Sequence, residues 1–168
     1  ESPLDDLRLR GAKAGATLFA RGEGIFFGSD ATDLSEIYFT CTSGGAGKMG
    51  QIFRYVPERK GAKGKPAETL QLFYESRSAD HYFYGDNLCL MPNGDLMVCE
   101  DSYEVLSRNH LRGVTPTGRA YAFARVHVQS ETAGACFSPD GQTMFVNIYS
   151  PAMTLAITGP WDKRIDAA

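Results

Sequence analysis

The 168-residue sequence is short of positive charge, since 17 Lys and Arg residues stand against 20 Asp and Glu residues and the net charge is −3. Proteins whose main partner is a nucleic acid or an anionic membrane usually present a basic surface, so we expect neither partner. No apolar run approaches the roughly 18 residues of a membrane span, and the N-terminal residues lack the basic and apolar regions of a secretory signal. We therefore expect a soluble chain, and a start without Met or an export segment is typical of a piece of a longer protein.

Cysteine is also scarce, and no CxxC or Cys/His spacing of a zinc site is present. Each thiol lies in or beside an apolar run, which favours buried thiols that behave as small hydrophobic side chains. A disulfide between Cys89 and Cys99, across a hairpin, is the alternative. The four residues are Cys41, Cys89, Cys99 and Cys136.

Two common catalytic patterns are missing. The Gly-rich stretch "TSGGAGKMG" at 42–50 lacks the GxxxxGK[ST] spacing of a phosphate-binding loop and does not open a helix. No GxSxG motif occurs, and the three histidines, His81, His110 and His127, form no recognisable triad pattern. Neither a nucleotide-binding site nor a serine hydrolase is indicated.

The runs that are present predict an all-β chain. Residues 4–16 are expected to include a short helix, with Pro3 and the acidic Asp5 and Asp6 at its start. After it come short runs rich in β-branched and aromatic residues, separated by Gly, Pro, Asn and Asp. These runs are 17–20, 24–27, 36–42, 51–56, 69–75, 87–91, 95–100, 120–128, 134–138, 143–148 and 154–158.

An internal repeat narrows the fold class. "CLMPNGDLMVCE" from Cys89 and "CFSPDGQTMFVNI" from Cys136 share Cys, an apolar residue, Pro-Asn/Asp-Gly and a Met closely followed by Val, 136 − 89 = 47 residues apart. This distance is close to the length of a propeller blade, and the Asn-Gly and Asp-Gly pairs suit tight hairpin turns. We predict a single domain over residues 1–168: a partial β-propeller of about three blades. Since closed propellers have four or more blades, we expect the missing blades in another segment of a longer chain, or self-association of this one.

Carboxylates collect at the ends of the expected strands. Hard cations such as calcium prefer carboxylate, amide and carbonyl oxygens, and in a propeller one set of strand ends converges on the central channel. These residues are therefore candidate metal ligands, although Asp-Asn before a strand is also ordinary turn chemistry and Glu-Asp after one is an ordinary polar stop. They are Glu23, Asp86, Asn87, Glu100, Asp101 and Glu131.

Arg21 lies two residues before Glu23 on a glycine-rich segment. A guanidinium group matches the oxygens of a phosphate, so Arg21 is well placed to bind an anionic substrate beside a metal site. The alternative is an exposed arginine without a specific role.

Taken together, these segments resemble the C-terminal portion of the PhoX family of alkaline phosphatases, in the same order, from about Leu4 to Trp161. The segments are "GATLFARGEGIFFG", "IYFTCTSGG", "GQIFRYVPE", "DNLCLMPNGDLMVCED", "LRGVTPTGRAYAFAR" and "SETAGACFSPDGQTMFVNIYSPAMTLAITGPW".

The resemblance implies a secreted or periplasmic β-propeller phosphatase that acts on small phosphate monoesters with a calcium and iron cluster. It implies catalytic roles for Arg21, which contacts the substrate phosphate, and for Glu23, which ligates the cluster. Five further residues carry over as metal ligands by motif alone: Asp86, Asn87, Glu100, Asp101 and Glu131.

The chain departs from the family in two ways. Gly22 and Gly85 stand where the family usually has Pro, so the loops around both sets of ligands are expected to be looser. The family's chains are also several times longer, and their N-terminal half carries further ligands, including a cysteine for iron.

Three hypotheses follow. The first is a metal-dependent phosphatase that is incomplete as an isolated fragment. The second is a non-catalytic, calcium-stabilised propeller module for binding or assembly. The third, a lactonase-like calcium propeller, needs an acid-base pair that no residues here suggest.

Overall fold

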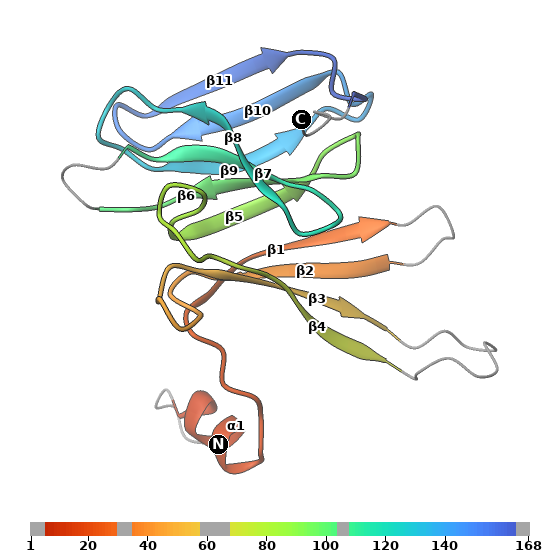
Figure 1. The fold of residues 1–168 in the computed structure, drawn as a ribbon, viewed down its shortest axis with the longest axis vertical. Coiled ribbons are helices and arrows are strands. Elements are labelled where there is room, and N and C mark those ends of the chain that lie inside the picture. The colour runs from red at the N-terminus through yellow and green to blue at the C-terminus, as the bar shows by residue number, and fades with distance from the viewer. Residues whose placement is uncertain (1–5, 30–34, 58–67, 104–107, 164–168) are drawn as a thin grey trace.

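The computed structural model describes residues 6–29, 35–57, 68–103 and 108–163, which form one short helix and three antiparallel sheets (Figure 1). The helix α1 spans Leu7–Lys13. The first sheet contains β1 (Gly22–Ser29), β2 (Ser35–Cys41), β3 (Gln51–Val56) and β4 (Thr69–Glu75). The middle sheet contains β5 (Gly85–Leu90), β6 (Leu96–Glu100), β7 (His110–Val114) and β8 (Ala120–Arg125), and the third contains β9 (Thr132–Phe137), β10 (Thr143–Ile148) and β11 (Met153–Thr158).

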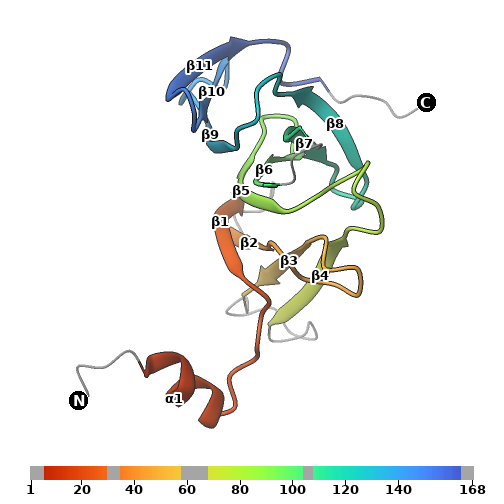
Figure 2. The same ribbon diagram turned by 90° about the vertical axis from the view of Figure 1, so that its left-hand side faces the viewer.

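Within each sheet the strands lie side by side in chain order, so each sheet is an antiparallel meander of the kind that forms a propeller blade. The prediction of an all-β fold with about three blades is confirmed. The first strands of the sheets meet at the centre, because β5 contacts both β1 and β9 (Figures 1 and 2). The three inner strands therefore bring residues from distant parts of the sequence together.

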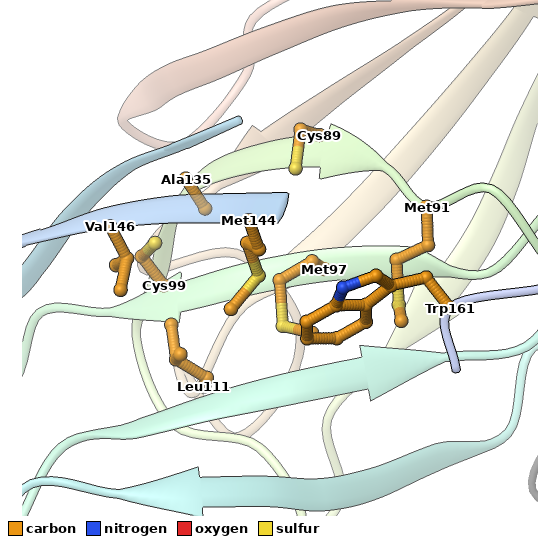
Figure 3. Packing of buried hydrophobic residues seen from close by; sticks show 9 residues of the cluster. All are labelled: Cys89, Met91, Met97, Cys99, Leu111, Ala135, Met144, Val146 and Trp161. Atoms are coloured by element: carbon orange, nitrogen blue, oxygen red, sulfur yellow. The ribbon is translucent and has the colours of Figure 1, made fainter. Parts of the chain in front are cut away.

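Two apolar layers hold the sheets together. The first and middle sheets share a cluster that includes Tyr38, Ile52, Tyr82 and Val98. The middle and third sheets share a layer rich in sulfur, in which Met91 and Met97 belong to the same cluster as the indole of Trp161 (Figure 3). Thioether sulfur packs favourably against aromatic rings. These layers fix the spacing of the inner strands.

The short helix forms within the predicted range and makes no contribution to the core. Its residues Leu7–Lys13 fall within the expected range of 4–16, of which residues 4 and 5 lie outside the described residues. No residue of α1 is buried, and the helix stands apart from the sheets (Figure 2). The apolar run 17–20 forms no strand. Among the described residues, no helix has the length and apolar character to cross a membrane.

The cysteine predictions hold at three of the four positions. All four thiols are free, so the predicted Cys89–Cys99 disulfide is wrong. The disulfide does not form because the strand register pairs Cys89 with Met97. Burial raises the pKa of Cys89 to about 12 and that of Cys99 to about 11, which makes both thiols unreactive. Cys136 is exposed, because strand alternation turns its neighbour Ala135 into the core and Cys136 outward.

Candidate active site

Each inner strand carries a β-bulge near its start. In β1 the residues Glu23 and Gly24 oppose one residue of β2, and in β5 Asp86 and Asn87 oppose one residue of β6. The register of β9 against β10 slips in the same region. A bulge bends the strand and redirects its side chains, and bulges are common beside active sites. The predicted ligands Glu23, Asp86 and Asn87 therefore lie on redirected segments of adjacent strands.

The same backbone hydrogen bond closes each of these segments. In each blade, the backbone amide of the residue that follows the second strand donates to the carbonyl oxygen of the residue just before the inner strand. The donors and their acceptors are Thr42 and Arg21 at 3.0 Å, Asp101 and Tyr84 at 2.9 Å, and Tyr149 and Glu131 at 3.2 Å. Arg21, Tyr84 and Glu131 are thus equivalent positions of three blades. The sequence signal, "RGEGI" beside "YGDNL", is too short to be found without the structure.

Thr40 joins β1 to β5 at the acidic residues. Its buried hydroxyl accepts a hydrogen bond from the Gly24 amide at 2.9 Å and donates one to the Asp86 carbonyl oxygen at 2.7 Å. A Cβ at Gly24 would clash with the backbone of Asp86 and Asn87, so only glycine allows the two strands to approach so closely. This contact places Glu23 next to Asp86.

We expect Thr40→Val to lower the free energy of unfolding by about 1–3 kcal/mol, because it keeps the shape and leaves the Gly24 amide and the Asp86 carbonyl without their partner. Thr154→Val is the matched control, since its exposed hydroxyl donates to Asn147 at 2.8 Å, and should cost less than about 1 kcal/mol. Urea unfolding followed by circular dichroism measures both. Equal costs for the two variants would contradict the role given to Thr40.

Asn87 connects the middle blade to the third. Its Oδ1 accepts a hydrogen bond from the Gly134 amide at 2.7 Å, and its Nδ2 donates to Asp86 Oδ1 at 3.4 Å. The side chain of Asn87 therefore orients the carboxylate of Asp86 and fixes β9 against β5.

Four of the predicted ligands influence one another electrostatically. Burial, followed by the charges of Glu23 and Asp101, raises the pKa of Asp86, and the charge of Arg21 opposes this shift. A hydrogen bond with Asp101, then burial, raises the pKa of Glu131 to about 7. Asp101 Oδ1 is buried and has no hydrogen-bond partner in the described part of the chain. We call Glu23, Asp86, Asp101 and Glu131 the acidic cluster.

The raised pKa of Glu131 predicts a pH dependence of stability in the metal-free protein. The folded state binds the proton more tightly than the unfolded state, whose pKa is near 4.5, so stability falls as the pH rises from about 4.5 to about 7. After allowance for solvent screening, we expect a loss of about 1–2 kcal/mol. Glu131→Gln should remove most of this slope and the exposed Asp162→Asn should keep it, as measured by urea unfolding in chelator from pH 4 to 8. The same slope in both variants would contradict the assignment.

Arg21 pairs with Glu23 across the mouth of the cluster, with Nη2 and Oε1 3.3 Å apart and the side chains 58% and 38% exposed. Exposed ion pairs contribute little to stability, so this pair orients the two groups. Arg21 also adopts a positive φ of 54°, which is costly for a residue with a Cβ.

Tyr103 is a site residue that the sequence analysis missed. Its hydroxyl donates to Glu131 Oε2 at 3.3 Å, and the charges of Asp101 and Glu131 raise its pKa to about 12. The contact joins residues 28 positions apart, and no local pattern marks it.

Glu100 is the predicted ligand that the structure does not bring to the cluster. Its Oε1 accepts hydrogen bonds from Arg112 Nε at 2.7 Å and from the Phe83 amide at 2.9 Å. Its Oε2 accepts from the His110 amide at 2.8 Å. Because adjacent strand residues point to opposite faces, Glu100 and Asp101 cannot both face the channel. We therefore leave Glu100 out of the candidate site.

Among the described residues, no three His, Cys, Asp or Glu side chains are arranged to hold a metal ion. The donor chemistry nevertheless fits a hard cation. The cluster holds four carboxylates beside a single guanidinium, retains a proton near neutral pH and leaves the buried Asp101 Oδ1 without a partner. Carboxylate oxygens with unmet charge are the ligands that calcium prefers.

Comparisons with known proteins identify a family and a structure of similar fold. The family model described as "Alkaline phosphatase PhoX" matches residues 2–152. A solved structure of Pseudomonas fluorescens PhoX in complex with vanadate, a transition state analogue, is similar in fold, with a TM-score of 0.62 and 19% sequence identity. The match covers 90% of this chain and 36% of that one, so the chain spans little more than a third of that relative. No curated protein matches the sequence.

Proposed function

Because the chain belongs to the PhoX family of alkaline phosphatases, we propose that it supplies part of the active site of a metal-dependent phosphatase that hydrolyses phosphate monoesters. The observation that carries this proposal is the meeting of Arg21 with the acidic cluster at the bulged starts of the inner strands. A basic fork beside a set of acidic oxygen ligands is an arrangement that binds phosphate together with metal ions.

Glu23, Asp86, Asp101 and Glu131 would hold the metal ions. Bound there, hard cations supply positive charge that stabilises the phosphoryl oxygens. We propose calcium and iron as these cations, from the resemblance to the family. Asn87 orients Asp86, and Thr40 holds β1 against β5, so both act as positioning residues.

Arg21 binds the phosphate group in this proposal. Its guanidinium is exposed and its 3.3 Å contact with Glu23 is open to solvent, so phosphoryl oxygens can compete for its donors. Glu23 keeps the guanidinium at the mouth of the cluster while its own carboxylate faces the metal position. The charge that Arg21 provides there is most valuable where negative charge develops in the transition state.

Glu131 holds a proton close to neutral pH in the metal-free protein, through its hydrogen bond with Asp101. Metal ligands bind in the deprotonated form, so Glu131 would release this proton when the ions bind. Tyr103, which donates to Glu131 Oε2, orients the carboxyl group.

Two further proposals follow from the family and concern the whole protein. The remaining blades, from a longer parent chain or a second copy, would supply the ligands that this chain lacks. The protein would act in the periplasm or outside the cell.

Turnover of p-nitrophenyl phosphate tests the proposed function, with this chain and with any longer parent that carries it. We expect activity in the longer form that disappears on chelation and returns when calcium and iron are added together. Activity that survives complete removal of metal would overturn the proposal. Calcium binding without iron and without turnover would instead support the non-catalytic, calcium-stabilised module.

A further inference from the structure

A groove of about 670 Å³ lies between the first and middle sheets, and no residue of the candidate active site lines it. It lies along the outer strands β4 and β8, which Figure 2 shows on the side of the sheets opposite to β1 and β5. Both sheets that form it belong to this chain, so additional blades are not needed to complete it. The lining residues are Leu72, Tyr74, Glu75, Arg77, His81, Gly118, Arg119 and Ala120.

The turn between β7 and β8 shapes one wall of the groove. Gly118 has a positive φ of 77°, and a Cβ there would come within 3.0 Å of the Phe73 carbonyl oxygen in β4. Two hydrogen bonds between Thr115 and Arg119 close the turn. The Thr115 amide donates to the Arg119 carbonyl oxygen, and the Arg119 amide donates to Thr115 Oγ1 at 3.1 Å. The backbone of Arg119 is therefore held in a fixed position at the groove.

The charges in the groove are mainly positive and unpaired. Arg77, His81 and Arg119 are exposed, and none of their side chains makes an ion pair or hydrogen bond with another residue of the described ranges. The one acid that lines the groove, Glu75, already accepts a hydrogen bond from Gln51 Nε2 at 2.6 Å. Two guanidinium groups and an imidazole thus line a groove that contains one carboxylate, which a hydrogen bond from Gln51 holds in place.

We propose that this groove is a second anion site, which binds a small organic molecule that carries a phosphate or phosphonate group. Guanidinium groups bind the planar sets of phosphate oxygens through paired donors. The ring of Tyr74 and the side chain of Leu72 provide an apolar wall for the organic part of the ligand, as is usual in small-molecule sites. The site is separate from Arg21 and does not depend on the proposed phosphatase activity.

Histidine NMR provides a direct test, because the chain has only three histidines and His81 is the one in the groove. The probe is phenylphosphonate, which a phosphatase cannot hydrolyse. We expect a saturable shift of the His81 imidazole resonances, assigned with His81→Gln, and little change at His110 and His127. Lack of a saturable shift at His81 would overturn the proposal.

Matched variants locate the binding. Arg77→Gln and Arg119→Gln should each raise the dissociation constant for phenylphosphonate, measured from the His81 shift, about tenfold. Arg8→Gln in α1 should leave it unchanged. Arg21→Gln should also leave it unchanged, and a loss of the His81 shift in that variant would assign the binding to the candidate active site instead. Equal affinity for benzoate would refute the phosphate class. Unchanged spectra outside the groove show that each variant is folded.

Discussion

Replacement of Arg21 by Gly is expected to lower kcat/KM for p-nitrophenyl phosphate by about 10²–10³-fold in the metal-loaded enzyme, the loss typical of one charge-stabilising group in an active site. The same change should leave the fold intact. Arg21 is exposed and its ion pair with Glu23 lies in solvent, so the lost contact contributes less than about 1 kcal/mol. Glycine also adopts the positive φ of 54° at this position without the cost of about 1–2 kcal/mol that a Cβ incurs there. This gain exceeds the roughly 0.5–1 kcal/mol that the freedom of glycine in the unfolded chain costs.

A gain in stability together with a loss of activity in Arg21→Gly would indicate that the strained backbone at this position is kept because the side chain of Arg21 is needed. Steady-state kinetics and thermal unfolding, measured on the same samples, provide the comparison. Arg21→Lys keeps the charge but loses the planar fork and should recover only part of kcat/KM, and Arg8→Gly in the exposed helix is the control for activity. Full kcat/KM in Arg21→Gly would remove Arg21 from the site.

The hairpin that carries most of the predicted ligands shows what local sequence can reveal. Its two strands, Gly85–Leu90 and Leu96–Glu100, and its Pro92-Asn93-Gly94 turn form as predicted, with Gly94 at a φ of 88°. Gly141 occupies the same place in the repeat, with a φ of 70°. Turn residues and strand alternation are local properties, so one sequence is enough to predict them.

The side of the hairpin on which each acid lies depended on contacts that local sequence does not show. Glu100 and Asp101 are neighbours in sequence, yet Glu100 is buried against Arg112 while Asp101 joins the acidic cluster. The alternation of side chains excludes a shared face for the two, but only the bulge in β5 and the partner on β7 decide which of them faces the channel.

The strand β7 was missed for the same reason. Its sequence, "HLRGV", has a charged residue and a glycine at its centre, where a buried strand normally has apolar side chains. Arg112 is buried there because Glu100, on the neighbouring strand β6, satisfies its charge. A buried charge can be anticipated only when its partner is known, and the two residues lie 12 positions apart.

The buried pair of Arg112 and Glu100 should therefore dominate the stability of the middle blade. Their side chains are only 4% and 3% exposed, and Arg112 Nε lies 2.7 Å from Glu100 Oε1. We expect Arg112→Met to lower the free energy of unfolding by about 3–5 kcal/mol, because a buried carboxylate loses its counter-charge. This is a large part of the 5–15 kcal/mol typical of a folded domain. Arg125→Met, on the exposed side of β8, should change it by less than about 0.5 kcal/mol.

A second substitution separates the buried charge from the lost packing. Glu100→Gln removes the charge and keeps an oxygen that can accept a hydrogen bond from the Phe83 or His110 amide. In the double variant the neutral Gln no longer needs a counter-charge, so Arg112→Met with Glu100→Gln should be less destabilised than the sum of the two single changes. Urea unfolding of the four proteins measures this coupling. Simple additivity would contradict the coupling of the two residues. Loss of metal binding in Glu100→Gln with unchanged stability would return Glu100 to the metal site.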